Sequence, residues 1–131
     1  MSTPKKVTGL GGIFVKCNDP EATRQWYAKH LGFSTEKWGT TFDWRNDDNP
    51  EQKGTSVWNA FPKETKHFDP SGRDLMINLI VENLEWLLGE LKKEGIEPVG
   101  AMEASEYGKF AHIMDPDGIK LELWEPAQDS I

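Results

Sequence analysis

Two segments of the chain repeat one pattern, a strand-like run followed by a helix-like run. They are residues 11–33, "GGIFVKCNDPEATRQWYAKHLGF", and residues 75–97, "LMINLIVENLEWLLGELKKEGIE". In each, residues alternate between two faces and then place apolar side chains at helical spacing. A residue suited to begin a helix and a glycine suited to end it stand 13 positions apart in the first and 12 in the second: Asp19 with Gly32, and Asn83 with Gly95. The repeat predicts an internal duplication.

The residues after each helix favour strands. In the first half the predicted strands are residues 34–38, 40–46 and 55–61, and in the second half 97–104, 109–114 and 119–126. Each half therefore reads β-α-β-β-β. The predicted fold class is α+β, with paired βαβββ modules in one domain: 7–66 and 74–126 within 1–131. The polar segment "FPKETKHFDPSGRD", with two prolines and a glycine, is the predicted connection between the halves.

The composition excludes several classes of partner. Fifteen basic and 22 acidic side chains give a formal charge of −7, which argues against a nucleic-acid or anionic-membrane partner. The single cysteine, Cys17, cannot form an internal disulfide, so a reducing compartment is expected. The first ten residues lack the apolar core of a signal peptide, and no apolar run reaches membrane length. We therefore expect a cytoplasmic protein.

The last two predicted strands can be aligned through the turn "DPDGI". Pro116 suits the first corner of a type I turn, and Gly118 suits a left-handed position. If Asp115 pairs with Ile119, His112 stands opposite Glu122 across the ladder. Alternation then gives one face to a group that includes both residues, and the other face, which should receive a helix, to Ala111, Ile113, Leu121 and Leu123.

The chain resembles the vicinal oxygen chelate superfamily, which includes glyoxalase I, the fosfomycin and bleomycin resistance proteins and the extradiol dioxygenases. The resemblance lies in the paired modules, in "NDPEATRQWYAKHLGF" and in "DPDGIKLELWEP", and it covers residues 7–126. It implies two sheet halves wrapped into a cup, with a helix behind each half. By this resemblance, and because open sheets leave unpaired edges, a homodimer is expected.

The resemblance also implies a metal site, and the sequence departs from it. Metal enzymes of the superfamily usually take a histidine from the start of the first strand, a histidine or glutamate from the start of the fifth, and a glutamate from the last. These positions correspond to Gly12, Met76 and Glu122. Glycine has no ligand atom and a thioether is a poor ligand for such metals, so only Glu122 is retained. We predict no cofactor, and keep a metal held by His112 with Glu122 as a weaker alternative.

Glu122 and His112 are the predicted catalytic residues. Histidine transfers protons near neutral pH, and a glutamate buried without a metal is expected to have a raised pKa. The alternatives are structural: Glu122 could face solvent or pair with a lysine (Lys16 or Lys120), and His112 could simply be its hydrogen-bond partner.

A wider set of residues is predicted to line the cup and contact substrate. Two are polar, Lys16 and Asn78, and the rest are aromatic: Phe14, Trp44, Trp58, Phe110 and Trp124, with Phe61 beside them. The alternative is that the aromatic rings fill the cup as core. The helical residues Trp26 and Trp86 are expected in the core or at an interface. His67, in the connecting segment, is not assigned to the site, although "HFDP" could form a lid.

Two functions are consistent with this pattern. The first is a glyoxalase-like enzyme that lacks the usual metal triad, in which Glu122 or His112 moves protons on a small oxygenated substrate. The second is a non-catalytic protein of bleomycin-resistance type that binds or sequesters a flat small molecule through its tryptophans. Both take a small-molecule ligand, and neither needs nucleic acid or a membrane.

Overall fold

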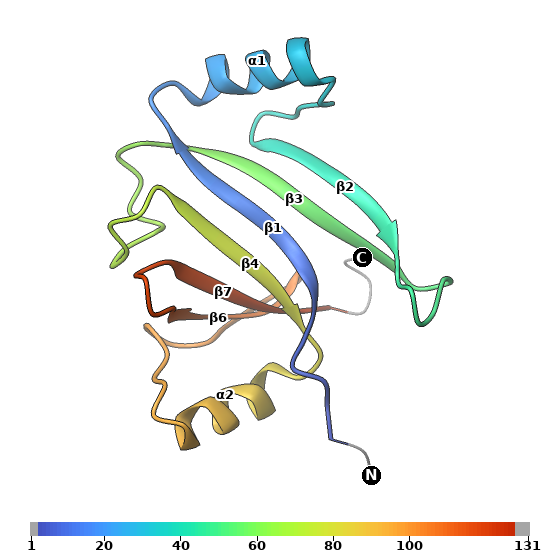
Figure 1. The fold of residues 1–131 in the computed structure, drawn as a ribbon, viewed down its shortest axis with the longest axis vertical. Helices are drawn as coiled ribbons and strands as arrows, with labels where there is room; N and C mark the ends of the chain where they lie inside the picture. The colour runs from blue at the N-terminus through green and yellow to red at the C-terminus, as the bar shows by residue number, and fades with distance from the viewer. Residues whose placement is uncertain (1–2, 128–131) are drawn as a thin grey trace.

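The computed structural model describes residues 3–127, which form one curved, mixed sheet and two helices (Figure 1). The strands are β1 (Val7–Cys17), β2 (Gly39–Arg45), β3 (Lys53–Pro62), β4 (Leu75–Val81), β5 (Glu103–Ser105), β6 (Gly108–Met114) and β7 (Lys120–Pro126). The helices are α1 (Pro20–Leu31) and α2 (Leu84–Lys93). The strand order across the sheet is β2-β3-β1-β4-β7-β6-β5. This is the predicted α+β class.

Long-range pairing joins the two halves at the centre of the sheet. β1 and β4, which begin the two repeats, run antiparallel to each other. Each also pairs in parallel with the last strand of its own half, β1 with β3 and β4 with β7. α1 contacts β1 and β3, and α2 contacts β6 and β7, so the helices lie at opposite ends of the molecule (Figure 1).

The first half has one strand fewer than predicted. Residues 34–38 form no strand. Their polar groups are bonded locally instead: Thr40 Oγ1 donates to the Ser34 carbonyl at 2.7 Å, and the Glu36 amide donates to the Gly39 carbonyl at 2.6 Å. The segment therefore turns the chain from α1 into β2. The second half does contain all three strands after its helix, although β5 is only three residues long.

The helix ends follow the predicted capping residues. Asp19 Oδ1 accepts a hydrogen bond from the Ala22 amide at 3.1 Å, and Asn83 Oδ1 accepts one from the Trp86 amide at 3.0 Å. Gly32 follows α1 in the left-handed region, with φ of 74°. These local signals were sufficient to place both helices.

The two faces of the sheet are covered by different parts of the chain. α2 packs on one face, where Leu84 and Leu87 join a buried cluster completed by Val81, Ala111, Ile113 and Leu123. The opposite face carries Phe14, Met76, Asn78, His112 and Glu122, and we call it the cup face. There the connecting segment supplies Phe68, fully buried against Phe14 and Met76. α1 buries none of its residues.

Neither helix in the described part of the chain is long and apolar enough to cross a membrane.

Candidate functional site

The hairpin of β6 and β7 has the predicted register. The Asp115 amide donates to the Ile119 carbonyl at 2.9 Å, and Gly118 is left-handed with φ of 82°. His112 is therefore paired with Glu122 in the ladder. The turn residues and strand alternation alone bring these two side chains to the same face.

Glu122 is bonded through both carboxylate oxygens. His112 Nε2 lies 2.8 Å from Oε2, and Asn78 Nδ2 donates to Oε1 at 2.7 Å. The second contact follows from the parallel pairing of β4 with β7, in which Asn78 stands beside Glu122. Asn78 and Glu122 are buried, and the His112 side chain keeps 16% of its surface exposed. The carboxylate is thus held between an amide and an imidazole, and neither Lys16 nor Lys120 forms an ion pair with it.

These partners reverse the predicted shift in the pKa of Glu122. Burial by itself raises the pKa, as we expected for a carboxyl group without a metal. The hydrogen bonds from His112 and Asn78 and the nearby imidazoles outweigh burial, and the pKa lies below its ordinary value. The prediction of a raised pKa is therefore wrong. Glu122 is a carboxylate at neutral pH and cannot serve there as a general acid.

His67 joins this group, which sequence reasoning missed. Its ring stacks on Phe61, with centroids 5.2 Å apart and planes within 9°, and its centroid lies 6.3 Å from that of His112. Lys120 Nζ donates to the His67 carbonyl at 2.8 Å, which holds the backbone in place. We call His67, Asn78, His112, Lys120 and Glu122 the polar cluster. One signal in the sequence could have indicated His67: it directly precedes Phe68, and the buried ring of Phe68 fixes the neighbouring residue on the cup face.

The connecting segment that carries His67 is attached to the β6–β7 turn. Ser71 Oγ donates to the Gly118 carbonyl at 2.5 Å, and Arg73 Nε donates to the Asp117 carbonyl at 3.0 Å. These bonds join residues more than 40 positions apart in the sequence. The segment therefore lies over the cup face rather than serving only as a link between halves.

The cluster shifts the pKa of two further groups. Partial burial lowers the pKa of His67, and the charge of Lys120 adds to this, although the charge of Glu122 opposes it. Burial also lowers the pKa of Lys120, against the opposing effect of Glu122. His67 is therefore neutral at physiological pH, and because its side chain is exposed, it lies where solvent meets the cluster.

The aromatic residues predicted to line the cup do not lie together. Trp58 is on the opposite face, where its ring packs at 4.5 Å from that of Tyr27 in α1. The prediction that it lines the cup is wrong, because alternation along β3 gives the cup face to Val57 and Phe61 instead. Trp44 Nε1 donates to Ser56 Oγ at 2.8 Å, and its ring lies against Gly54 and Gly9.

The other predicted contact residues lie on the cup face. Phe14 is buried against Phe68, as core rather than as an open wall. Lys16 Nζ lies over the Phe68 ring, 5.3 Å from its centroid. Phe110 and Trp124 stack with centroids 6.0 Å apart, and Trp124 Nε1 donates to the Tyr107 carbonyl at 2.9 Å.

The side chains at the superfamily's ligand positions do not fit a metal ion. Gly12 offers no donor, Met76 is fully buried among apolar side chains, and both oxygens of Glu122 are engaged by protein donors. Across residues 3–127, no group of three or more histidine, cysteine, aspartate or glutamate side chains is arranged to hold a metal. We therefore derive no chemical step through a metal.

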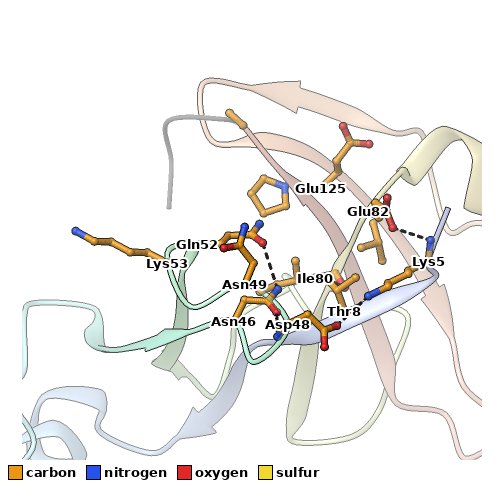
Figure 2. A pocket seen from close by; sticks show the side chains of 13 residues that line it. Lys5, Thr8, Asn46, Asp48, Asn49, Gln52, Lys53, Ile80, Glu82 and Glu125 are labelled. Atoms are coloured by element: carbon orange, nitrogen blue, oxygen red, sulfur yellow. Dashed lines mark hydrogen bonds and ion pairs between the residues drawn. The ribbon is translucent and has the colours of Figure 1, made fainter.

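A cavity of about 740 Å³ is lined by residues outside this cluster, which Figure 2 shows. It is formed by the start of β1, the β2–β3 turn and the ends of β4 and β7. Its polar groups bond mainly to one another: Lys5 Nζ lies 3.1 Å from Asp48, and Asn46 Nδ2 donates to Gln52 Oε1 at 3.3 Å. None of its lining residues belongs to the polar cluster, so this cavity and the polar cluster are separate parts of the structure.

The geometry of the cluster suits proton transfer by His112. Because Glu122 is ionised, it accepts a hydrogen bond from the Nε2–H group of His112, which leaves Nδ1 as the basic nitrogen of the neutral ring. No hydrogen bond to Nδ1 is present among the described residues. A carboxylate that orients an imidazole and stabilises its protonated form is the arrangement used by many general bases.

Comparison with known proteins assigns the family. Residues 9–123 match the family model described as Glyoxalase/Bleomycin resistance protein/Dioxygenase superfamily. The chain belongs to this superfamily. No curated protein is significantly similar to the sequence.

Several solved structures share the fold at low identity. Methylmalonyl-CoA epimerase from Mycobacterium tuberculosis aligns with a TM-score of 0.63 and 23% identity over 97% of this chain and 93% of that one. The Streptomyces coelicolor methylmalonyl-CoA epimerase aligns with a TM-score of 0.67 and 15% identity, over 92% and 99%. A superfamily member from Vibrio splendidus 12B01 aligns with a TM-score of 0.55 and 16% identity, over 94% and 99%. At these identities the likeness describes the fold.

Proposed function

We propose that this protein is a superfamily enzyme that moves a proton on a small carbonyl-containing substrate without the usual metal triad. His112 Nδ1 takes a proton from the carbon next to the carbonyl, and the electron pair of that C–H bond passes to the carbonyl oxygen as an enolate. Glu122 remains a carboxylate and stabilises the imidazolium. The imidazolium then returns the proton.

The observation that carries this proposal is the pair of His112 and Glu122. Their 2.8 Å contact is partly buried, and a second hydrogen bond from Asn78 holds the carboxylate. Histidines with a purely structural role also pair with carboxylates. Here, however, the exposed residue His67 lies next to His112, so the pair is close to solvent and a substrate can approach it. Lys120 Nζ uses one of its three N–H donors on the His67 carbonyl, which leaves two donors that could bind the negatively charged oxygen of an enolate.

The proposal is tested by exchange of substrate hydrogen with solvent. The protein is incubated in D2O with a panel of carbon acids, and loss of the α-proton signal is followed by 1H NMR. Methylmalonyl-CoA belongs in this panel because structural neighbours are named as its epimerase. We also include hemithioacetals of 2-oxoaldehydes, which carry a similarly acidic hydrogen.

Matched variants separate chemistry from binding. Glu122→Gln keeps the shape of the side chain but removes its charge, and is expected to slow exchange by about 10²–10⁴-fold, as is His112→Gln. His30→Gln is the control, because His30 is exposed at the end of α1. Exchange that continues unchanged in folded Glu122→Gln protein would refute the assignment.

A second candidate is binding without turnover, supported by the parallel Phe110 and Trp124 rings beside the cluster. It predicts quenching of tryptophan fluorescence by flat aromatic compounds, and loss of that quenching in Trp124→Leu. Saturable quenching with no exchange of any substrate would favour this function over the enzyme.

We further propose a homodimer in the cytoplasm. The sheet has open edges at β2 and β5. In addition, β1, which lies inside the sheet, exposes the apolar side chains of Val7, Leu10 and Ile13. Light scattering should give the mass of two chains, and Ile13→Lys should shift the mass toward one. A monomer at micromolar concentration would contradict the dimer and leave the reaction untouched.

A further inference from the structure

Two adjacent buried glycines lie opposite Asn78 in the sheet. The register between β1 and β4 shifts between Leu10 and Gly12, so that Gly11 is an extra residue in β1. Such a bulge places two residues of one strand against one of its partner. Asn78 is therefore faced by both Gly11 and Gly12, and neither of these presents a side chain to it.

The amide of Asn78 fills the space that a side chain on Gly11 would need. A Cβ at Gly11 would lie 2.9 Å from Asn78 Cγ and would overlap Oδ1 outright. Asn78 Oδ1 has no hydrogen-bond partner among the described residues, and Asn78 is 3% exposed. A buried oxygen without a partner is costly, so its position requires an explanation.

Asn78 Oδ1 is left without a partner because Asn78 turns its Nδ2 group toward Glu122. If the amide were reversed, Oδ1 would face the carboxylate oxygen of Glu122 and two acceptors would repel. In the observed orientation Nδ2 donates to Glu122 at 2.7 Å and Oδ1 lies against the backbone of Gly11. Only a residue without Cβ at this point leaves room for that oxygen.

We propose that Gly11 is a positioning residue for the site: its missing side chain lets Asn78 hold Glu122 in the orientation that receives His112. The role of this arrangement in turnover rests on the proposed function, but the arrangement itself does not. Gly11 acts through Asn78 and Glu122 and makes no contact with a substrate.

The test is a double-mutant cycle read by NMR without any substrate. The variants are Gly11→Ala, Asn78→Ala and the two combined, with Gly89→Ala as the matched control, since nothing lies within 4 Å of a Cβ there. The first signal is hydrogen exchange of the Asn78 side-chain amide. The second is the fraction of His112 imidazole that carries its proton on Nε2, read from 15N shifts.

Gly11→Ala is expected to speed exchange of the Asn78 amide roughly tenfold, as for the loss of one hydrogen bond, and to lower the Nε2-protonated fraction of His112. In the Asn78→Ala background the same substitution should leave the His112 signal unchanged, because the amide it displaces is gone. Gly89→Ala should change neither signal.

Three results would overturn the proposal. One is a Gly11→Ala protein with the wild-type signals of both residues. Another is an effect of Gly11→Ala on His112 that persists in the Asn78→Ala background. The third is a double variant that fails to fold, since Gly11 would then serve the bulge itself. If Gly11→Ala fails to fold and the double variant folds, the clash with Asn78 is the reason and the proposal stands.

The outcome is independent of the proposed reaction. A protein with the expected NMR signals that exchanges no carbon acid would refute the reaction and keep the role of Gly11. Solvent exchange of substrate at the wild-type rate in Gly11→Ala protein with altered signals would show that positioning is real but not needed for turnover.

Discussion

The two halves of the molecule begin with the same strand–helix pattern but cover the sheet in different ways. α2 buries Leu84 and Leu87 completely or nearly so, whereas α1 leaves Trp26 54% and Leu31 58% exposed and buries no residue. On the cup face it is the connecting segment, through Phe68, that supplies a fully buried side chain. Helical spacing of apolar residues therefore indicates a helix, and tertiary contacts decide whether its apolar side is used.

The largest effect is expected at Phe68, which tests whether the connecting segment is part of the core on the cup face. Phe68→Ala should destabilise the protein by about 3–5 kcal/mol, because it leaves a large cavity against Phe14 and Met76. Urea unfolding measures this loss. It should also release His67, visible as loss of its ring-current shift from Phe61. A change below about 1 kcal/mol would mean that the segment is not part of the core.

Leucine substitutions in the two helices compare the halves directly. Leu84→Ala should cost about 2–5 kcal/mol, because the side chain is fully buried, whereas Leu31→Ala should change stability by no more than about 0.5 kcal/mol in the monomer. Both residues are leucines and both lie at a helix terminus, so the pair is a matched control. Equal losses would show that α1 is covered in solution, and a concentration-dependent loss at Leu31 would indicate an intermolecular contact.

Measuring stability as a function of acid pH tests whether the folded second half lowers the pKa of Glu122. Its pKa is lower in the folded protein than its ordinary value of 4.5, so it stabilises the fold fully above that value and this stabilisation is lost as the pH falls through the folded pKa. Stability of the wild type should therefore fall more steeply below pH 4.5 than that of Glu122→Gln. Urea midpoints at a series of pH values measure the two slopes, and parallel slopes would contradict the lowered pKa.

The smallest effect is expected at His67, where the two halves meet. Its folded pKa lies below the ordinary value of 6.5, so the folded protein binds this proton less readily than the unfolded chain. Stability is then slightly reduced as the pH falls through 6.5, and His67→Gln should remove that change. The C2–H resonance should titrate with a midpoint below 6.5. A midpoint at or above that value would mean that the ring is not held against Phe61.

Much of the fold and part of the site could be predicted because the signals were local. Asp19 and Asn83 cap their helices because each supplies a side-chain oxygen at the right step of the chain. His112 meets Glu122 because one turn sets the register and strand alternation carries it along both strands. No contact between distant segments was needed for either prediction.

Other features depended on which distant segments meet. The faces of the sheet are defined by alternation, but alternation does not say which face carries the site, and so Trp58 was assigned to the wrong one. Residues 34–38 carry strand-like composition but pair with no neighbour as a strand. Burial raises the pKa of Glu122, and the hydrogen bonds from His112 and Asn78 outweigh it; Asn78 reaches the carboxylate only because β4 pairs with β7.

By itself, the sequence determined the two strand–helix repeats, their capping residues, the register of the last hairpin and the superfamily, because each is written in short-range spacing. The tertiary structure decided that α1 stays exposed, that the connecting segment brings Phe68 and His67 onto the cup face, and that Glu122 is held as a carboxylate. The contacts of Asn78 with Glu122 and of Lys120 with His67 join residues more than 40 positions apart, and their free energy arises only when the whole sheet is assembled.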